Sequence, residues 1–326
     1  MLKHILKRLG IAVFILLAFS MILYAIMRAQ PADFIELTIP QDGEFPPEFF
    51  DALREALGLN YGIVRGYFAW LGQVLRGNLG YSFSQQSRPV TELISNYMGL
   101  SFLIGLIALI LQMAIAIPLG IHAAVKQYSK FDYITTIFVV MGISLPSFFF
   151  AGLLIRVFSV QFGWFPAAGG LPGEVMAPGT PGIVRFFNNA WGLVLPITTM
   201  VVLGIGGTMR YMRTNTLEVL RSDFIRTARA KGLGEGAVIY KHAFKNTVVP
   251  LATIMAGILP GLFAGSLIIE QLFMLPGVGF MAYRALNAGD LPLVMGYNLF
   301  IATLAVLGII LSDIMYVIVD PRVKMN

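Results

Sequence analysis

The chain has 326 residues, of which 57% are hydrophobic and 12% are charged, about half the charged share of a typical soluble domain. It contains no cysteine, which excludes disulfides, thiolate metal sites and cysteine nucleophiles, and its three histidines are too dispersed to suggest a metal cluster. We therefore expect an integral membrane protein that binds no nucleic acid, whose net charge of +6 reflects basic residues retained on the cytoplasmic side.

Six apolar stretches free of charged residues are each long enough to cross roughly 30 Å of hydrocarbon as a helix. They run near 9–27, 99–121, 133–155, 186–209, 247–269 and 291–312. The first is too long for a secretory signal, and no clear cleavage site follows it. The sequence therefore predicts an all-α membrane protein with six transmembrane helices.

Charge asymmetry predicts the orientation. With the N-terminus inside, the inside segments hold fifteen of the 23 Lys and Arg residues, eight of them between Arg210 and Lys245. The loop 31–98 has the opposite balance, with eight acids against four arginines. The excess of basic residues on the cytoplasmic side predicts that both termini are cytoplasmic.

The outer loop and the spans carry further local signals. "PPEFFDALREALGL" (46–59) and "VTELISNYMGL" (90–100) are typical of short helices, and the second leads toward a span. Prolines interrupt the spans at Pro118, Pro146, Pro196, Pro250 and Pro260. They are either simply tolerated or bend the bundle around a pathway, and the sequence favours neither interpretation.

The search for enzyme chemistry finds no catalytic constellation and no metal site. A phosphate-cradling G-x-x-x-x-G-K-[ST] loop is absent from the sequence, so ATP chemistry would need a partner. "GIS" ending at Ser144 resembles part of an intramembrane serine protease motif, but no histidine lies deep in a span to act as its base. Asp313 lies inside a span and Glu270 at a span edge, which raises the alternative of a self-sufficient secondary carrier.

The most basic stretch is "RTARAKGLGEGAVIYKHAFKN", from Arg226 to Asn246. Before it, Leu217, Leu220, Phe224 and Ala228 recur at helical spacing, and "GLGEG" then breaks the helix. The pattern predicts a helix, a glycine elbow and a second helix over the loop 210–246. Small residues near the elbow would let another protein approach closely, although a solvated basic loop fits the spacing equally well.

"RTARAKG" (226–232) resembles the EAA loop of ABC-importer permeases, in the variant used by the peptide/nickel permease family. The resemblance extends over nearly the whole chain. Within the family, the chain resembles the first of the two permease subunits, the dipeptide/oligopeptide B-type. It is carried jointly by "LKRLG", "LRGNLGYSF" (75–83), "RPVTELI" (88–94), "IPLGIHAA" (117–124), "SLPSFF" (144–149), "FGWFPAAGG" (162–170), "LPGVGF" (275–280) and "DPRVK" (320–324).

The resemblance implies the permease subunit of a type I, binding-protein-dependent importer in the bacterial or archaeal cell membrane, not an enzyme. Its partners would be a second homologous permease, two cytoplasmic ATP-binding subunits and an external substrate-binding protein. ATP and Mg would belong to the ATP-binding subunits, with no cofactor in this chain. The implied division is 1–92 for the first helix and outer loop, 93–320 for the permease core, and 321–326 for a tail.

Carried over by position, the ATPase-docking residues would be Arg226, Thr227, Ala228, Arg229, Ala230, Lys231, Gly232, Leu233 and Gly234. Arg226 stands where the general motif has glutamate, so the partner of that glutamate is not carried over. A stretch like "PGDP" is common in the family after the first span, and "QPADFIELTIPQDGEFPPEF" replaces it here. Polar groups in the spans that could line a pathway, or equally hydrogen-bond between helices, are Gln112, Ser144, Thr198 and Ser266.

Overall fold

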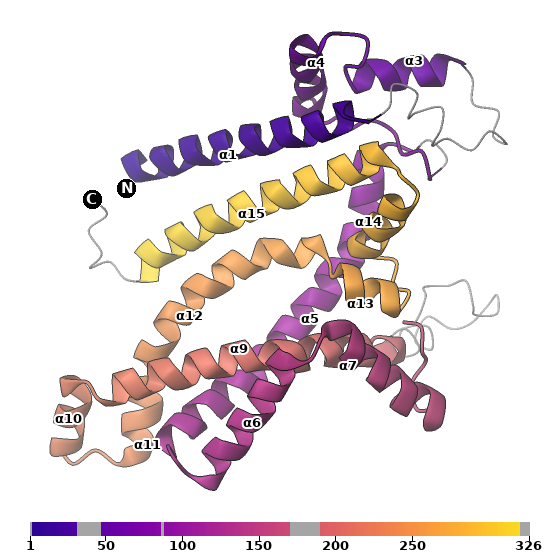
Figure 1. The fold of residues 1–326 in the computed structure, drawn as a ribbon. Coiled ribbons are helices and arrows are strands. Elements are labelled where there is room, and N and C mark those ends of the chain that lie inside the picture. The colour runs from indigo at the N-terminus through magenta and orange to yellow at the C-terminus, as the bar shows by residue number, and fades with distance from the viewer. Residues whose placement is uncertain (1, 31–46, 86–87, 170–189, 320–326) are drawn as a thin grey trace, which may run out of the picture.

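The computed structural model describes residues 2–30, 47–85, 88–169 and 190–319 (Figure 1). Within these ranges the regular structure is helical, apart from an isolated bridge that pairs Tyr81 with Pro89. The expected stretch "QPADFIELTIPQDGEFPPEF" falls largely outside the described residues, as do 186–189 at the start of the expected fourth span.

Within the described residues, four uninterrupted helices are long and apolar enough to cross a membrane. They are α1 (Leu2–Arg28), α5 (Val90–Val125), α9 (Val194–Leu220) and α15 (Leu291–Val319). The helix expected at 90–100 is the beginning of α5, so the boundary expected after residue 92 lies in the first turn of this helix. Pro118 lies inside α5 without breaking it.

The expected span 133–155 is not one straight helix. α6 (Lys130–Ser144) is followed, after a bend of 105° at Leu145–Pro146, by α7 (Ser147–Leu154), which continues as the π-helical segment η1 (Ile155–Gln161). Pro146 explains the break, because proline has no amide hydrogen and forces the preceding residue into an extended conformation, as seen at Leu145. The bent pair counts as a fifth candidate span when it is taken as one.

The expected span 247–269 is also interrupted. α12 (Phe244–Ile258) is followed by a 3-10 turn η3 (Leu259–Ala264), then Gly265 and α13 (Leu267–Leu272). The 15 residues of α12 rise about 22 Å, less than the roughly 30 Å hydrocarbon core. Pro260 and the positive φ of 70° at Gly265 end the α-helical geometry early. An uninterrupted sixth span is therefore wrong for this segment.

The bundle is held by close contacts between α5, α6 and α9. A Cβ at Gly120 of α5 would lie 2.8 Å from the Met209 carbonyl oxygen of α9. A Cβ at Gly206 of α9 would lie 2.7 Å from a side-chain carbon of Ile143 on α6. These glycines let the backbones approach closely, as small residues do between membrane helices.

α1 packs along α15 through an ion pair. Arg8 Nε lies 3.0 Å from Asp313 Oδ2. Asp313 therefore has an ion-pair partner on a neighbouring helix, which favours a packing role for this carboxylate over a transport role.

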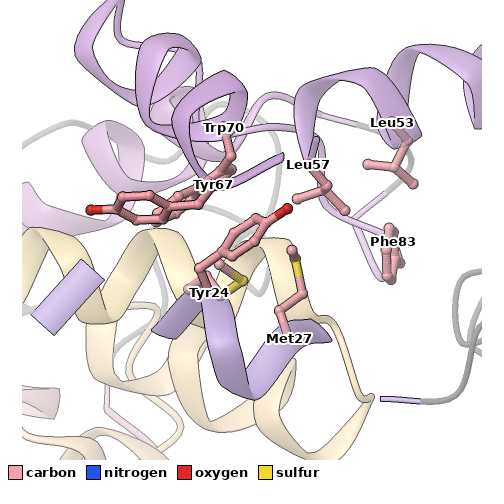
Figure 2. Close-up of a cluster of buried hydrophobic side chains, with 8 residues drawn as sticks. Tyr24, Met27, Leu53, Leu57, Tyr67, Trp70 and Phe83 are labelled. Atoms are coloured by element: carbon pink, nitrogen blue, oxygen red, sulfur yellow. The ribbon is translucent and has the colours of Figure 1, made fainter. Parts of the chain in front are cut away.

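The helices that follow α1 pack against its C-terminal end. The expected helix at 46–59 is present as α3 (Pro47–Ala56), followed by α4 (Ile63–Leu75). Their buried residues meet α1 in one apolar cluster (Figure 2), made of Tyr24, Met27, Leu53, Leu57, Tyr67, Trp70, Phe83 and Met295. Arg28 donates to the carbonyls of Leu59 and Tyr61, so the end of α1 also anchors the loop before α4.

The two ends of the bundle differ in what they carry. The N-terminus of α1, the C-terminal end of α15, and α10 (Asp223–Ala230) lie toward one end, whereas α3, α4 and α14 (Val278–Asn287) lie toward the other (Figure 1). Trp191 lies just before the start of α9 and donates from Nε1 to the carbonyl of Trp164 at 2.8 Å.

Candidate functional site

The charged loop between α9 and α12 forms an ordered protrusion. α9 ends at Leu220, α10 (Asp223–Ala230) follows, and after a turn come α11 (Glu235–Ala237) and the π-helical segment η2 (Val238–Ala243), which leads into α12. Asp223 lies in the first turn of α10 and Arg229 in the last, where each charge suits the helix dipole. The predicted order of helix, glycine elbow and helix is confirmed.

The protrusion has its own small core. Ile225, Ala228, Val238 and Ala243 are buried together, with Val219 and Leu220 packed against them. The register differs from the predicted stripe, because the helix breaks at Arg221–Ser222 and restarts at Asp223. After the restart Ile225 and Ala228 face inward, and Phe224 is 46% exposed instead of continuing the buried stripe.

Gly232 closes the turn after α10. Its φ is +77°, in the left-handed region that favours glycine. The amide of Gly232 donates to Arg229 O at 2.9 Å and the amide of Leu233 to Ala228 O at 3.4 Å. These two bonds are the Schellman pattern, which satisfies carbonyls at the end of a helix. A Cβ at Gly232 would meet no atom within 4 Å, so the requirement for glycine here is conformational and not steric.

An ion pair bridges the turn on its outer side. Arg229 donates to Glu235 from Nε at 2.8 Å and from Nη2 at 3.3 Å. Both side chains are substantially exposed, at 44% and 62%, so the pair orients the turn more than it stabilises it. Among the described residues, the ion-pair partner of Arg226 is Asp223, 3.5 Å away on the same helix, and the Arg226 side chain is 77% exposed.

Eight of the nine predicted docking residues are exposed on this protrusion: Arg226, Thr227, Arg229, Ala230, Lys231, Gly232, Leu233 and Gly234. Ala228 is not, because it lies three residues after Ile225 on the inward face and is 7% exposed. Ala228 instead packs into the core of the protrusion, and its contact with another protein stays a prediction. Sequence reasoning missed Phe224 and Tyr240, which are exposed apolar side chains on the same protrusion. The Ser222–Asp223 helix-start signal could have predicted the change of register.

The four pathway candidates do not gather at one place. Gln112 of α5 donates from Nε2 to Gly204 O at 3.0 Å and to Thr208 Oγ1 at 2.7 Å, so it hydrogen-bonds across to α9. Ser144 is the exposed last residue of α6, and Thr198 is half-buried on α9. Of the four, only Ser266 lines a small cavity of about 60 Å³, beside Ser101 and Glu270.

Glu270 is a buried carboxylate held by donors from three elements. Oε1 accepts from Ser101 Oγ at 2.8 Å and from the Ser266 amide at 3.1 Å, and Oε2 accepts from the Phe280 amide at 3.0 Å. Ser101 in turn accepts from the Val278 amide at 2.8 Å. The carboxylate thus ties α5 to the N-terminal turns of α13 and α14. Among the described residues, no group of three or more His, Cys, Asp or Glu residues could hold a metal ion.

Comparison with known proteins shows which family the chain matches. A model of the family described as "Binding-protein-dependent transport system inner membrane component" matches residues 116–325, and a model of the N-terminal part of the same membrane component matches residues 1–103. The chain is 35% identical over 324 residues to the oligopeptide transport system permease protein AppB of Bacillus subtilis, covering 99% of this chain and 100% of the relative.

Two further relatives cover the same extent. A putative peptide permease protein of Brucella suis biovar 1 is 34% identical over 330 residues, covering 100% of both chains. The oligopeptide transport system permease protein OppB of Haemophilus influenzae is 32% identical over 327 residues, covering 99% of this chain and 100% of the relative. The chain therefore belongs to the family of inner membrane permease components of binding-protein-dependent transport systems.

Proposed function

We propose that this chain is the permease subunit of an ATP-driven peptide importer and forms half of a translocation pathway for dipeptides and oligopeptides. Membership in the binding-protein-dependent permease family supports transport, and the full-length relatives named as peptide or oligopeptide permeases support the substrate class. A second homologous permease would form the other half, and an external substrate-binding protein would deliver the peptide.

The proposed topology has six crossings in a type I importer fold, with both termini in the cytoplasm. The bent pair α6–α7 would make one crossing, and α12 with η3 the remaining one. The N-terminal end of α1, the C-terminal end of α15 and the basic protrusion share one end of the bundle (Figure 1), which supports the orientation expected from the charge asymmetry. The proposal divides the chain into the first helix with the outer loop (1–92), the permease core (93–320) and a short cytoplasmic tail (321–326).

The protrusion is the proposed docking element for one of the two cytoplasmic ATP-binding subunits, which would carry ATP and Mg²⁺. The observation that carries this proposal is an ordered helix–turn–helix with its own core at the charge-rich end of the bundle. Its exposed surface combines cations such as Lys231 with apolar side chains, among them Leu233, 41% exposed, and Tyr240, 67% exposed. Because an internal core keeps the protrusion rigid, movement of an ATPase would be passed directly to α9 and α12.

Reconstitution tests the function. The purified chain, its second permease, the ATP-binding subunits and the binding protein are placed in liposomes, and uptake of a labelled oligopeptide is measured. We expect uptake only with the whole set and ATP. Gradient-driven uptake by the chain alone would instead establish the secondary-carrier alternative.

Docking is tested by Leu233→Asp, which places a charge on the exposed turn without touching its core. We expect the ATP-binding subunits to be lost on co-purification. The matched control is Leu286→Asp on α14 at the opposite end, where the side chain is 62% exposed. Equal retention of the ATP-binding subunits by both variants would remove the docking proposal while leaving the peptide-transport proposal open.

A further inference from the structure

α4 (Ile63–Leu75) has three chemically distinct faces, although it follows α1 in a loop outside the candidate spans. Gly66, Tyr67 and Trp70 form the face buried against α1. Val64, Phe68 and Leu75 share a second face by helical spacing, and they are 71%, 64% and 80% exposed. A third face carries Arg65, Ala69 and Gln73, spaced four residues apart.

The contacts of the buried face fix which way α4 is turned. The Tyr67 hydroxyl lies 2.9 Å from Ser20 Oγ and 3.5 Å from the Leu17 carbonyl oxygen, toward the middle of the α1 span. On the other flank, a Cβ at Gly66 would lie 2.4 Å from the Gly58 carbonyl oxygen, in the turn between α3 and α4 that Arg28 holds at the C-terminal end of α1. The Tyr67 side of α4 is therefore nearer to the middle of the α1 span, and the Gly66 side is nearer to the C-terminal end of α1.

Helical geometry then places the two exposed faces. At about 100° per residue, the rotation from Gly66 through Trp70 to Tyr67 continues to the apolar face. The opposite rotation from Gly66 reaches Gln73, Ala69 and Arg65. The apolar face of Val64, Phe68 and Leu75 is thus turned toward the hydrocarbon, and the polar face toward the aqueous side. Figure 1 shows α4 crossing α1 steeply near the end of this span, as a helix lying in the membrane plane would.

The surroundings of α4 fit a lipid interface. α1 exposes Phe14, Met21 and Ile22, at 71%, 57% and 58%, along the span on which α4 rests. The charged residues within and just after α4 are two arginines, Arg65 and Arg76, which suit lipid phosphates, and its contact face is rich in the aromatic residues that gather at membrane interfaces.

We propose that α4 is an interfacial helix that lies in the headgroup region, with Val64, Phe68 and Leu75 immersed in lipid acyl chains and Arg65 directed to the headgroups. Its assignment to the outer leaflet rests on the proposed orientation of the chain, but its immersion in lipid does not. The occupant of the exposed apolar face is the bilayer, and neither the second permease nor the binding protein.

The absence of cysteine from the sequence makes the test direct. Single cysteines replace Phe68 or Leu75 on the apolar face, and Ala69 or Gln73 on the polar face, and each carries a nitroxide spin label. The full chain is assembled with its partner subunits in vesicles of phosphatidylethanolamine and phosphatidylglycerol. Collision rates with oxygen, which partitions into lipid, and with a water-soluble nickel chelate present on both sides are measured by electron paramagnetic resonance.

We expect the ratio of oxygen to chelate collisions to be at least severalfold higher for Phe68→Cys and Leu75→Cys than for Ala69→Cys and Gln73→Cys. High chelate access at the apolar positions would place α4 in water and overturn the proposal. Low access of both reagents there would show that a protein covers the face, and would overturn it equally. Because the chelate is on both sides, the result is independent of chain orientation and of whether peptide is transported.

Discussion

Arg213 and Asp132 join α9 to the start of α6 by a two-pronged ion pair. Arg213 donates from Nε to Asp132 Oδ1 at 2.7 Å and from Nη2 to Oδ2 at 2.8 Å. Oδ2 also accepts from the Tyr128 amide at 3.0 Å, so the carboxylate orders the loop before α6 as well. The Asp132 side chain is 5% exposed, which makes the pair a partly buried one.

Asp132→Asn is expected to destabilise the assembled transporter by about 1–3 kcal/mol, because it leaves the guanidinium of Arg213 without its charged partner. The measurement is the thermal unfolding midpoint of the detergent-solubilised complex. Asp51→Asn is the matched control, because Asp51 is 78% exposed and lies 3.7 Å from Arg54. That change should cost no more than about 0.5 kcal/mol. Equal midpoints for the two variants would show that the Arg213 contact contributes little.

Gly232→Val is expected to abolish peptide uptake while leaving membrane insertion intact. Left-handed backbone costs a non-glycine residue about 1–2 kcal/mol, and more for a β-branched one, so the turn after α10 would reorganise. Gly232→Asn should retain much of the uptake, because asparagine tolerates this conformation. Gly236→Ala is the control, since Gly236 lies in α11 outside the predicted docking residues and a Cβ there would meet no atom within 4 Å. Uptake assays at matched membrane levels decide, and normal transport by Gly232→Val would contradict the prediction.

Asp290→Ala is expected to loosen the segment around Ser82 from α15. Asp290 Oδ2 accepts from Ser82 Oγ at 2.5 Å, from the Ser84 amide at 2.9 Å and from Ser84 Oγ at 2.8 Å, and Oδ1 accepts from the Leu293 amide at 3.2 Å. Losing these charge-assisted bonds should cost about 2 kcal/mol or more.

Hydrogen–deuterium exchange of the peptide that contains residues 80–85 measures this loosening. Ser84→Ala removes one of the four donors and should raise exchange much less than Asp290→Ala. Unchanged exchange in Asp290→Ala would mean that other contacts hold the segment.

Glu270→Gln is expected to lower the unfolding midpoint, because the amide nitrogen would face a backbone donor where a carboxylate oxygen now accepts. The cost should be about 1–3 kcal/mol for a buried donor left unsatisfied. Glu92→Gln, at an exposed position in the first turn of α5, serves as the control. If the two variants unfold at the same temperature, the donors around Glu270 do not depend on its charge.

Much of the fold was predictable from the length of the apolar segments and from the distribution of charge. Four uninterrupted spans were predictable because each is a long apolar segment, and the helix from Pro47 was predictable from its proline start. The breaks in the other two segments were not predictable, although both segments contain prolines. Pro118 is accommodated within α5 while Pro146 ends α6, and the difference depends on tertiary contacts that the local sequence does not record.

The helix–turn–helix of the protrusion was predictable, but which of its side chains point inward was not. The glycine elbow followed from composition. The inward position of Ala228 depends on where α10 starts, because a break in a helix changes the direction in which every later side chain points. Similarly, Gln112 was recognisable as a polar residue in a span, while its bond to α9 required the neighbouring helix. Arg213 lies 81 residues from its partner Asp132, and Ser101 lies 169 residues from its partner Glu270, so no local pattern predicts these two contacts.

The elbow at Leu145–Pro146 has a consequence for the membrane around it. The last turn of a helix leaves carbonyl oxygens without helical amide partners, and Pro146 supplies no donor in their place. In pure hydrocarbon each such oxygen would cost several kcal/mol. In the proposed crossing by α6 and α7, the carbonyls at the end of α6 therefore require donors from a neighbouring helix, a neighbouring subunit or water.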